Sequence, residues 1–534
     1  MTDFKKVIGP LAIALTVVAS VLLFFRLGHY SLWDDEAVVA LSAKGILRSG
    51  DTTAVIDHNL VAYRHGILLS DLHDRSTPPL PAYVTAISFF IFGESALTAR
   101  LPFAVCGMLW ILLVLRWLSK EKVEVSVWIL FILGIIGNVS LFLFFRQCRY
   151  YGIAILCSST IAYLYLNWTG RMRELIWIAL LSIPLFAANY MNFFALYGCL
   201  VFDYAIWGRK RRRLNLKEWA ALLLPQIVVA GIIFSIWNPL KTGNSAGLLS
   251  ATESLKVWLM CISFFDLNAC EFGAGVLLLL APFVALFCRD LWLLRSFFAL
   301  VVYVVLTSAL SPQVMDEGTH HSDIRYLAPI IPLCIFIGVR VLILITRKAP
   351  CIAFPLAILA FGSNLLEGVT LRPFYFHSTV VRYVGELMHP PLDTYKPTAA
   401  WVRDNVPASA SVWVVPDEMT YPLMFHAPQP TYAWQLIDPS QPELKALDPI
   451  HFLGSVPPDY IIIFGPQMKR VTKELEHVSP PASYGQVALI DVFWRDTYRP
   501  ELYWRRFDQK TSFNRATEAV YVLKRTVATG QGRN

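Results

Sequence analysis

Three consecutive carboxylates follow the first long apolar segment of the chain. They are Asp34, Asp35 and Glu36, and they open a helical pattern that stops at Gly50. Successive residues of a helix point about 100° apart, so the three side chains cannot converge on one atom. Ser31 and Asp34 have the spacing of a helix-capping box, and we therefore expect Asp34 to cap the helix. Asp35 and Glu36 remain as candidates for acid–base chemistry or as an acidic helix start favoured by the helix dipole.

Arginine–tyrosine pairs are a second chemical feature. Arg149 precedes Tyr150 in a short turn that also holds Arg146, and Arg325 precedes Tyr326 at the start of a later apolar segment. Arginines beside apolar segments are uncommon, so these positions are candidates for a functional role. The same residues would also occur as ordinary anchors and aromatic belts at the ends of membrane spans.

Two adjacent histidines, His320 and His321, lie shortly before Arg325. Imidazole and carboxylate groups together form many divalent-metal sites. Spacing within a loop is weak support for such a site, so the sequence leaves room for a divalent metal and identifies no certain cofactor. The nearby carboxylates are Asp316, Glu317 and Asp323.

The composition indicates a membrane protein as the scaffold for these residues. Of 534 residues 56% are hydrophobic and only 16% are charged, whereas about 25% are charged in ordinary soluble proteins. Mean hydropathy is +0.52. These values exclude disordered, collagen-like and small disulfide-framework proteins.

The net charge of +8 does not indicate a nucleic-acid partner. From residue 370 onward there are 17 Lys and Arg against 16 Asp and Glu, so the excess lies in the apolar part of the chain. It gathers there in short loops such as residues 208–217 (GRKRRRLNLK). Such loops are typical of the cytoplasmic side of a membrane protein.

The apolar segments predict about 11 membrane spans within residues 1–369. Residues 78–92 form only about 15 residues between prolines and a glycine, so we expect an interfacial helix there. The basic loops then share the cytoplasmic side, and the 26–96 loop, the turn at 146–151 and the C-terminal region lie outside. We expect a bacterial inner membrane, with these parts facing the periplasm or exterior. The expected spans are about 7–25, 97–117, 125–145, 149–168, 174–188, 191–207, 217–237, 271–288, 292–310, 326–346 and 350–369.

Residues 370–534 predict a separate extracytoplasmic α/β domain. Short β-like runs alternate with helical ones, which is typical of helices packed on a sheet. All nine cysteines lie before residue 352, so no disulfide holds this domain together. It has no glycine-rich phosphate loop and does not read as a nucleotide site. The expected strands are 411–415, 460–464, 487–494 and 519–524, and the expected helices are 398–405 and 418–426.

The order of several motifs resembles a known family. After the first span come WDDE (33–36), TPPLPAY (77–83), FGES (92–95) and RLP (100–102), followed by RQCRYY (146–151) and RYLAP (325–329). This order is similar to that of the polyprenyl-phosphate-sugar-dependent glycosyltransferases of the GT-C fold. The nearest branches are the protein O-mannosyltransferases and the aminoarabinose transferases of lipid A. The resemblance covers most of the membrane part and fades after residue 370.

The resemblance implies roles for individual residues. Asp35 matches the presumed catalytic base, with Glu36 as its neighbour, and Arg149 matches the arginine of the outer turn. Arg146 lies on a similar helical face and could share the phosphate, and Arg325 is a second lipid-phosphate contact. Tyr150 and Tyr326 could stack on sugar or isoprenoid. Thr77 stands where many relatives carry a histidine before Pro-Pro-Leu, so that histidine's role does not carry over.

The implied reaction moves a hexose or pentose from a polyprenyl-phosphate carrier to a protein, lipid or glycan hydroxyl on the outer face. The departing phosphate has a second pKa of about 6 and needs no general acid. One carboxylate on the opposite face of the sugar can deprotonate the acceptor, which inverts the anomeric centre. A transporter or flippase for lipid-linked glycans is the alternative, although such proteins favour mid-span ionisable residues and repeated halves. A non-catalytic scaffold is a third interpretation.

Overall fold

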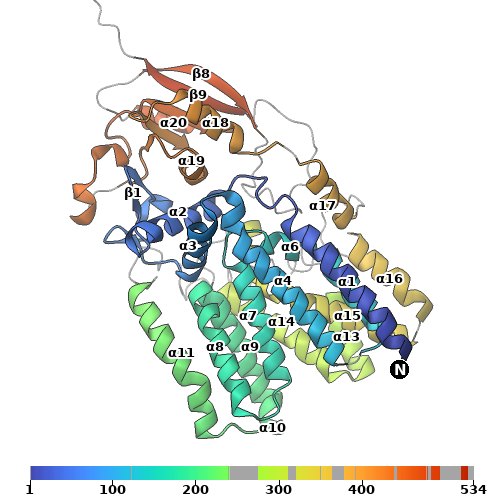
Figure 1. Ribbon diagram of the computed structural model, residues 1–534. Coiled ribbons are helices and arrows are strands. Elements are labelled where there is room, and N and C mark those ends of the chain that lie inside the picture. Colours follow the sequence, from blue (N-terminus) through green and yellow to red (C-terminus); the bar gives the residue numbers. More distant parts are fainter. Residues whose placement is uncertain are drawn as a thin grey trace, which may run out of the picture. The chain divides into compact units, whose positions relative to one another are not determined.

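The fold is described from a computed structural model (Figure 1). It describes residues 2–121, 123–238, 240, 275–310, 320–348, 350–363, 378–390, 392–437, 442–476, 478, 483–492 and 519–526. The chain divides into two compact units. The helical unit comprises Met1–Arg26, Leu101–Ile236 and Ser245–His389. The mixed unit comprises Leu27–Arg100, Trp237–Asn244 and Pro390–Asn534, so the loop after the first helix groups with the C-terminal residues.

A helix coincides with each of the eleven segments expected to span the membrane. Helices α7, α8, α9 and α11 run beside one another within the helical unit (Figure 1). The helices are α1 (Thr2–Phe24), α4 (Ala96–Lys120), α5 (Val125–Gly137), α6 (Val139–Phe145), α7 (Tyr151–Leu166), α8 (Met172–Ala188), α9 (Tyr190–Asp203), α11 (Leu216–Ile236), α13 (Gly275–Cys288), α14 (Leu291–Leu310), α15 (Ile331–Lys348) and α16 (Pro350–Gly362).

The apolar helices make this chain a multi-pass membrane protein. Within the described residues, length and composition qualify four helical segments as spans: Ala96–Lys120, Leu216–Ile236, Leu291–Leu310 and Arg325–Arg347. A fifth is added if α5 and α6 form one bent span. Other apolar helices, among them Tyr151–Leu166 and Gly275–Cys288, are shorter. The count of about 11 spans therefore stays a prediction.

The segment expected as one continuous span at 125–145 is broken in the structure. α5 and α6 are bent by 60° at Asn138. The Asn138 side chain accepts a hydrogen bond from the backbone N–H of Leu141 at 3.1 Å, and so caps α6. Asn is a strong N-cap residue, which explains why a new helix begins here. The break sets the direction of α6, which ends at Phe145 and has Arg146 as its C-cap residue.

The C-terminal part of the mixed unit is built on a five-stranded sheet of order β6-β5-β7-β9-β8. The three strands β6, β5 and β7 run parallel, and β9 and β8 are antiparallel to their neighbours. Trp413, Trp434, Ile461 and Ile463 form the centre of its core. The elements are β5 (Ser411–Val415), β6 (Thr431–Tyr432), β7 (Tyr460–Phe464), β8 (Ser483–Asp491) and β9 (Ala519–Thr526), with helices α18 (Lys396–Asn405), α19 (Thr420–His426) and α20 (Met468–Leu475). Helix α17 (Thr379–Met388) precedes them in the chain and belongs to the helical unit.

The expected α/β architecture is confirmed, with local corrections. Helix α18 begins at Lys396, before the expected 398, and the expected helix 418–426 starts as a 3-10 turn before α19. β8 begins earlier than the expected 487, and residues 493 and 494 lie outside the described residues. Strand β6 and helix α20 were not predicted.

The N-terminal part of the mixed unit contains α2 (Asp34–Ser49) and α3 (Leu80–Phe92). As expected, α2 stops before Gly50, which adopts a φ of 80°. α2 packs against α3 and against α19 of the C-terminal part. Two short hairpins lie between α2 and α3, with strands β1 (Val55–Ile56), β2 (Asn59–Leu60), β3 (Leu69–Ser70) and β4 (His73–Asp74). The carboxylates of α2 are thus held by residues from both ends of the sequence.

Candidate active site in two parts

The capping box expected between Ser31 and Asp34 is wrong, because α2 begins differently. Trp33 is the N-cap residue, and Asp34 is the first residue of the helix. The N–H of Trp33 donates to Glu36 Oε2 at 3.4 Å. Glu36 is three residues after the cap, so it occupies the position that Glu or Gln normally takes in a capping box. The N–H of Ser31 instead donates to Asp393 Oδ2 at 2.6 Å.

Glu36 is fully engaged by Arg100 at the start of α4. Arg100 Nε donates to Glu36 Oε1 at 2.9 Å, and Arg100 Nη2 donates to Oε2 at 2.6 Å. Both side chains are completely buried. The remaining N–H groups of Arg100 donate to the carbonyls of Leu27, Tyr30 and Ser31 at 2.9–3.1 Å. The pair therefore fixes the loop that leads into α2, and the geometry gives Glu36 a positioning role.

Asp35 lies next to this pair in a different setting. Its Oδ1 accepts a hydrogen bond from the hydroxyl of Tyr63 at 3.1 Å, and 4% of the residue is exposed. Tyr63 belongs to a 3-10 turn (Tyr63–Gly66), and its ring meets Tyr421 edge-on at 5.6 Å. The Tyr63 hydroxyl therefore orients the Asp35 carboxylate.

Two residues of the C-terminal part hold the entry loop of α2. The N–H of Leu32 donates to Nε2 of His426 at 3.1 Å. Burial lowers the pKa of His426 to about 4, although Asp393 opposes this shift. The histidine is therefore neutral at neutral pH, which leaves Nε2 as the acceptor that this contact requires. Asp393 Oδ1 also accepts from the backbone N–H groups of Tyr395 and Lys396 at 2.8 and 2.6 Å.

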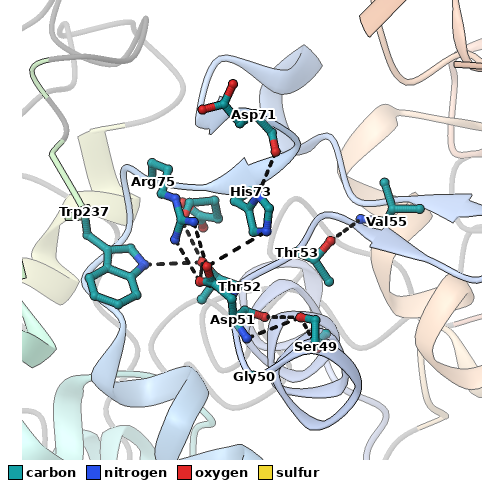
Figure 2. A network of polar contacts seen from close by, with 12 residues as sticks. Ser49, Gly50, Asp51, Thr52, Thr53, Val55, Asp71, His73, Arg75 and Trp237 are labelled. Atoms are coloured by element: carbon teal, nitrogen blue, oxygen red, sulfur yellow. Dashed lines mark hydrogen bonds and ion pairs between the residues drawn. The ribbon is translucent and has the colours of Figure 1, made fainter. Parts of the chain in front are cut away.

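The loop between α2 and α3 is tied by a separate polar network (Figure 2). Arg75 Nη1 and Nη2 donate to the two carboxylate oxygens of Asp51 at 2.8 and 2.7 Å. Arg75 lowers the pKa of Asp51 to about 2 through this hydrogen bond and its charge. Trp237 Nε1 donates to Thr52 Oγ1 at 3.3 Å, and Arg75 lies over the Trp237 ring. His73 Nε2 lies 3.9 Å from Asp51 Oδ2.

Thr77 sits at the end of this network. Its backbone N–H, like that of Ser76, donates to Asp74 Oδ1 at 3.0 Å. Asp74, Ser76 and Thr77 thus form an Asx turn, and two prolines separate it from α3. The contacts therefore explain Thr77 as part of the helix entry, and its contact with substrate stays a prediction.

The arginines of the other group lie in the helical unit. Arg146 is 2% exposed and ends α6. Its Nη1 donates to the carbonyls of Leu22, Leu23 and Phe25 at 3.0–3.2 Å, and Nη2 donates to Arg26 at 3.3 Å. The last carbonyls of a helix have no partner within the helix, so Arg146 satisfies the end of α1. This assigns Arg146 to the structure of the unit.

Arg149 and Arg325 have a different environment. The Arg149 guanidinium lies 5.7 Å from the ring centre of Tyr150, and that of Arg325 lies 5.3 Å from the ring centre of Tyr326. Both guanidinium groups act electrostatically on the Tyr150 hydroxyl, which is buried and has no hydrogen-bond partner among the described residues. Arg149, Tyr150, Arg325 and Tyr326 therefore belong to one cluster. Asn192 Nδ2 supports it by donating to the Tyr326 carbonyl at 2.8 Å.

The expected site residues thus form two groups, each within its own unit. Asp35, Glu36 and Thr77 belong to the mixed unit, whereas Arg146, Arg149, Tyr150, Arg325 and Tyr326 belong to the helical unit. The side chains of His320 and His321 and the nearby Asp316, Glu317 and Asp323 side chains lie outside the described residues. Among the described residues no group of three His, Cys, Asp or Glu could hold a metal ion. The side chains of the expected metal site are not among those residues, so that site stays a prediction.

The fold matches solved structures at low sequence identity. A structure of ArnT from Cupriavidus metallidurans bound to undecaprenyl phosphate has a TM-score of 0.55 and 13% identity, covering 98% of this chain and 99% of that chain. The apo state of the same ArnT gives 0.54 and 12%, with coverage of 96% and 97%. No protein-family model and no curated protein matches the sequence. The chain has a GT-C fold, as the sequence motifs predicted.

We predict that Arg100→Met destabilises the protein by about 3–5 kcal/mol, because it leaves the Glu36 carboxylate buried without its cation. Arg100→Met with Glu36→Leu should recover part of that loss, since neither charge remains. Unfolding in detergent measures both. Arg48→Met is the matched control, because its pair with Asp57 is exposed, with 42% and 61% of the side chains accessible, and it should change stability by less than about 1 kcal/mol. Equal effects of Arg100→Met and Arg48→Met would contradict the positioning role.

The lowered pKa of His426 predicts a pH dependence of stability. The unfolded histidine, with a pKa near 6.5, takes up a proton before the folded one, whose pKa is about 4. Stability is therefore fully retained above pH 6.5 and falls as the pH drops towards 4, by about 3 kcal/mol in total. His426→Gln keeps an acceptor for Leu32 but does not titrate, so its unfolding should vary less with pH in this window. His389→Gln, at an exposed histidine, should keep the wild-type slope, and an unchanged slope in His426→Gln would refute the assignment.

Proposed function

We propose that this protein is an integral membrane glycosyltransferase that takes a sugar from a polyprenyl-phosphate carrier. The observation that carries the proposal is the ArnT-like fold over nearly the whole chain, combined with the different settings of two adjacent acids. Glu36 is locked to Arg100, whereas Asp35 is oriented by a neutral tyrosine. Glu36 is thus committed to an ion pair, and the proposal assigns the proton transfer to its neighbour Asp35.

Asp35 acts in this proposal as the general base. It removes the proton from an acceptor hydroxyl, the hydroxyl oxygen forms a bond to the anomeric carbon, and the bond from that carbon to the phosphate oxygen breaks. The electron pair leaves with the polyprenyl phosphate, which is stable as an anion and needs no added proton. Attack from the face opposite the phosphate inverts the anomeric centre.

Arg149 and Arg325 hold the phosphate of the donor. They share one cluster with Tyr150, whose buried hydroxyl is an additional hydrogen-bond donor for a phosphate oxygen. Guanidinium groups match phosphate geometry and remain charged in an apolar setting. Arg146 is left out of this clamp, because the carbonyls at the end of α1 already occupy its donors.

The reaction takes place on the outer face of the membrane. The proposal rests on the basic loops, which the positive-inside pattern assigns to the cytoplasm, opposite the Arg146–Tyr151 turn. A bacterial inner membrane with the site facing the periplasm fits this orientation. ArnT was solved with bound undecaprenyl phosphate, and a carrier of this class is the donor proposed here. The acceptor is a hydroxyl group of a protein, a lipid or a glycan.

We expect Asp35→Asn to abolish sugar transfer while folding and donor binding stay close to wild type. Asn keeps the acceptor oxygen that the Tyr63 hydroxyl needs but cannot take a proton. The measurement is sugar release from a synthetic polyprenyl-phosphate sugar by the purified protein, with thermal unfolding of each variant alongside. Asp34→Asn is the matched control, because its side chain points about 100° away on the helix, and it should retain transfer. Near-wild-type turnover by Asp35→Asn would remove the proposed base.

Arg149→Lys should weaken donor binding by at least about tenfold even though the charge is kept. A lysine ammonium is a point charge and cannot form the two parallel hydrogen bonds of a guanidinium fork. Titration with a polyprenyl-phosphate analogue measures the loss, and Arg173→Lys, at an exposed position of α8, is the control that should bind as wild type. If both variants bind equally well, Arg149 is an ordinary anchor at the end of a span.

A further inference from the structure

A large cavity lies inside the helical unit and is not part of the proposed phosphate cluster. Its volume is about 620 Å³, within the usual range for a small-molecule site. Residues of α4, α5, α7, α9, α14 and α15 line it. The lining is largely aromatic and aliphatic, with Trp110, Trp117, Phe131, Leu196, Trp292 and Phe336 as representatives.

One buried arginine supplies the main polar feature of this cavity. Arg295 Nε and Nη2 donate to the two oxygens of Asp203 at 2.8 and 2.7 Å. The Tyr165 hydroxyl donates to Asp203 Oδ2 at 2.7 Å and strengthens this arrangement. Arg295 is 5% exposed, and its third nitrogen, Nη1, is buried with no hydrogen-bond partner in the described part of the chain. A buried guanidinium nitrogen without an acceptor is costly, so it indicates a ligand with an acceptor oxygen.

Two further polar atoms of the cavity lining are also buried without a hydrogen-bond partner in the described part of the chain. They are Ser158 Oγ and Tyr163 Oη. The Tyr163 ring stacks on Trp117 at 4.0 Å, which holds its position. An apolar chamber with a few polar atoms fits an amphiphile, whose chain fills the chamber and whose oxygen atoms meet the donors.

Ser158 lies midway along α7, whereas the other polar groups lie at the helix ends opposite the phosphate cluster. Tyr150 and Arg149 precede the first turn of α7, whereas Tyr163 and Tyr165 lie in its last turns, about 20 Å further along the axis. Asp203 ends α9, and Arg295 lies near the start of α14. These ends adjoin basic loops, including residues 171–173 and 208–217. Clusters of Lys and Arg at span ends attract anionic lipid head groups.

We propose that this cavity binds one anionic glycerophospholipid of the bilayer. An acyl chain lies among the apolar side chains, and a phosphate or ester oxygen accepts a hydrogen bond from Arg295 Nη1. The chain of the donor's polyprenyl phosphate is the competing occupant, because Pro329 and Ile330 of the lining closely follow Tyr326 of the phosphate cluster. A phospholipid is favoured because Arg295 and the basic loops lie at the opposite end of α7 from Arg149. The placement of the donor phosphate rests on the proposed function, whereas the cavity and the buried Arg295 do not.

The test uses the full-length protein, purified from neutral phosphatidylcholine nanodiscs doped with phosphatidylglycerol. Native mass spectrometry after mild detergent exchange counts the lipids that remain bound and identifies them. Wild type should retain one phosphatidylglycerol in preference to phosphatidylcholine. Ala299→Phe fills the cavity from α14 and Ala162→Phe fills it from α7, so each should lower the retained fraction at least about fivefold. Ala220→Phe, at an exposed position of α11, is the matched control and should retain the lipid.

Thermal unfolding of each variant shows that it is folded. Added phosphatidylglycerol should raise the unfolding temperature of wild type and Ala220→Phe but not of the two cavity variants. If one cavity variant fails to fold, the other variant and the lipid preference of wild type still decide the question. Equal retention of both phospholipids by wild type, unchanged retention in a folded cavity variant, or a retained polyprenyl phosphate in place of a phospholipid would each overturn the proposal.

Discussion

The buried pair between Glu36 and Arg100 is the interaction on which the proposed chemistry depends. A fully buried ion pair is stable only when nearly all hydrogen-bonding groups of both side chains are satisfied. Arg100 meets this condition by donating to Glu36 and to three carbonyls of the loop before α2. The pair thereby fixes both the start of the helix and the path of the chain towards it. Asp35 is the next residue on the helix, so the pair also fixes its position.

The helical unit uses an arginine in a comparable way. Arg146 donates to carbonyls at the end of α1, and Arg100 donates to carbonyls of the loop that follows α1. Each guanidinium therefore satisfies backbone carbonyls that have no partner within a helix. Arg149 lies only three residues after Arg146, and its guanidinium lies 5.7 Å from the ring centre of Tyr150. Two arginines of one motif therefore contact different groups.

The sequence predicted features that depend on local pattern. Helix α2 and its stop at Gly50, the strands at 411–415 and 460–464 and the helical segments of the apolar part all follow from periodicity or hydropathy within one stretch. What it missed depends on distant partners. Arg100 is 64 residues from Glu36, and His426 is 394 residues from Leu32. The expected Ser31–Asp34 cap failed for the same reason, because Asp393, far along the chain, takes the N–H of Ser31. The break at Asn138 could have been predicted from the sequence, because asparagine is a preferred N-cap residue.

The acidic cluster also shows why three adjacent carboxylates are compatible with a folded helix start. The dipole at the N-terminus of α2 favours negative charge, but three buried carboxylates would still repel one another. Arg100 offsets the charge of Glu36 through two hydrogen bonds, and the Tyr63 hydroxyl donates to Asp35. A protein that needed only stability could neutralise or replace both acids at lower cost. The ion pair with Arg100 commits Glu36 to the structure of the helix start, and this difference favours Asp35 over Glu36 as the base.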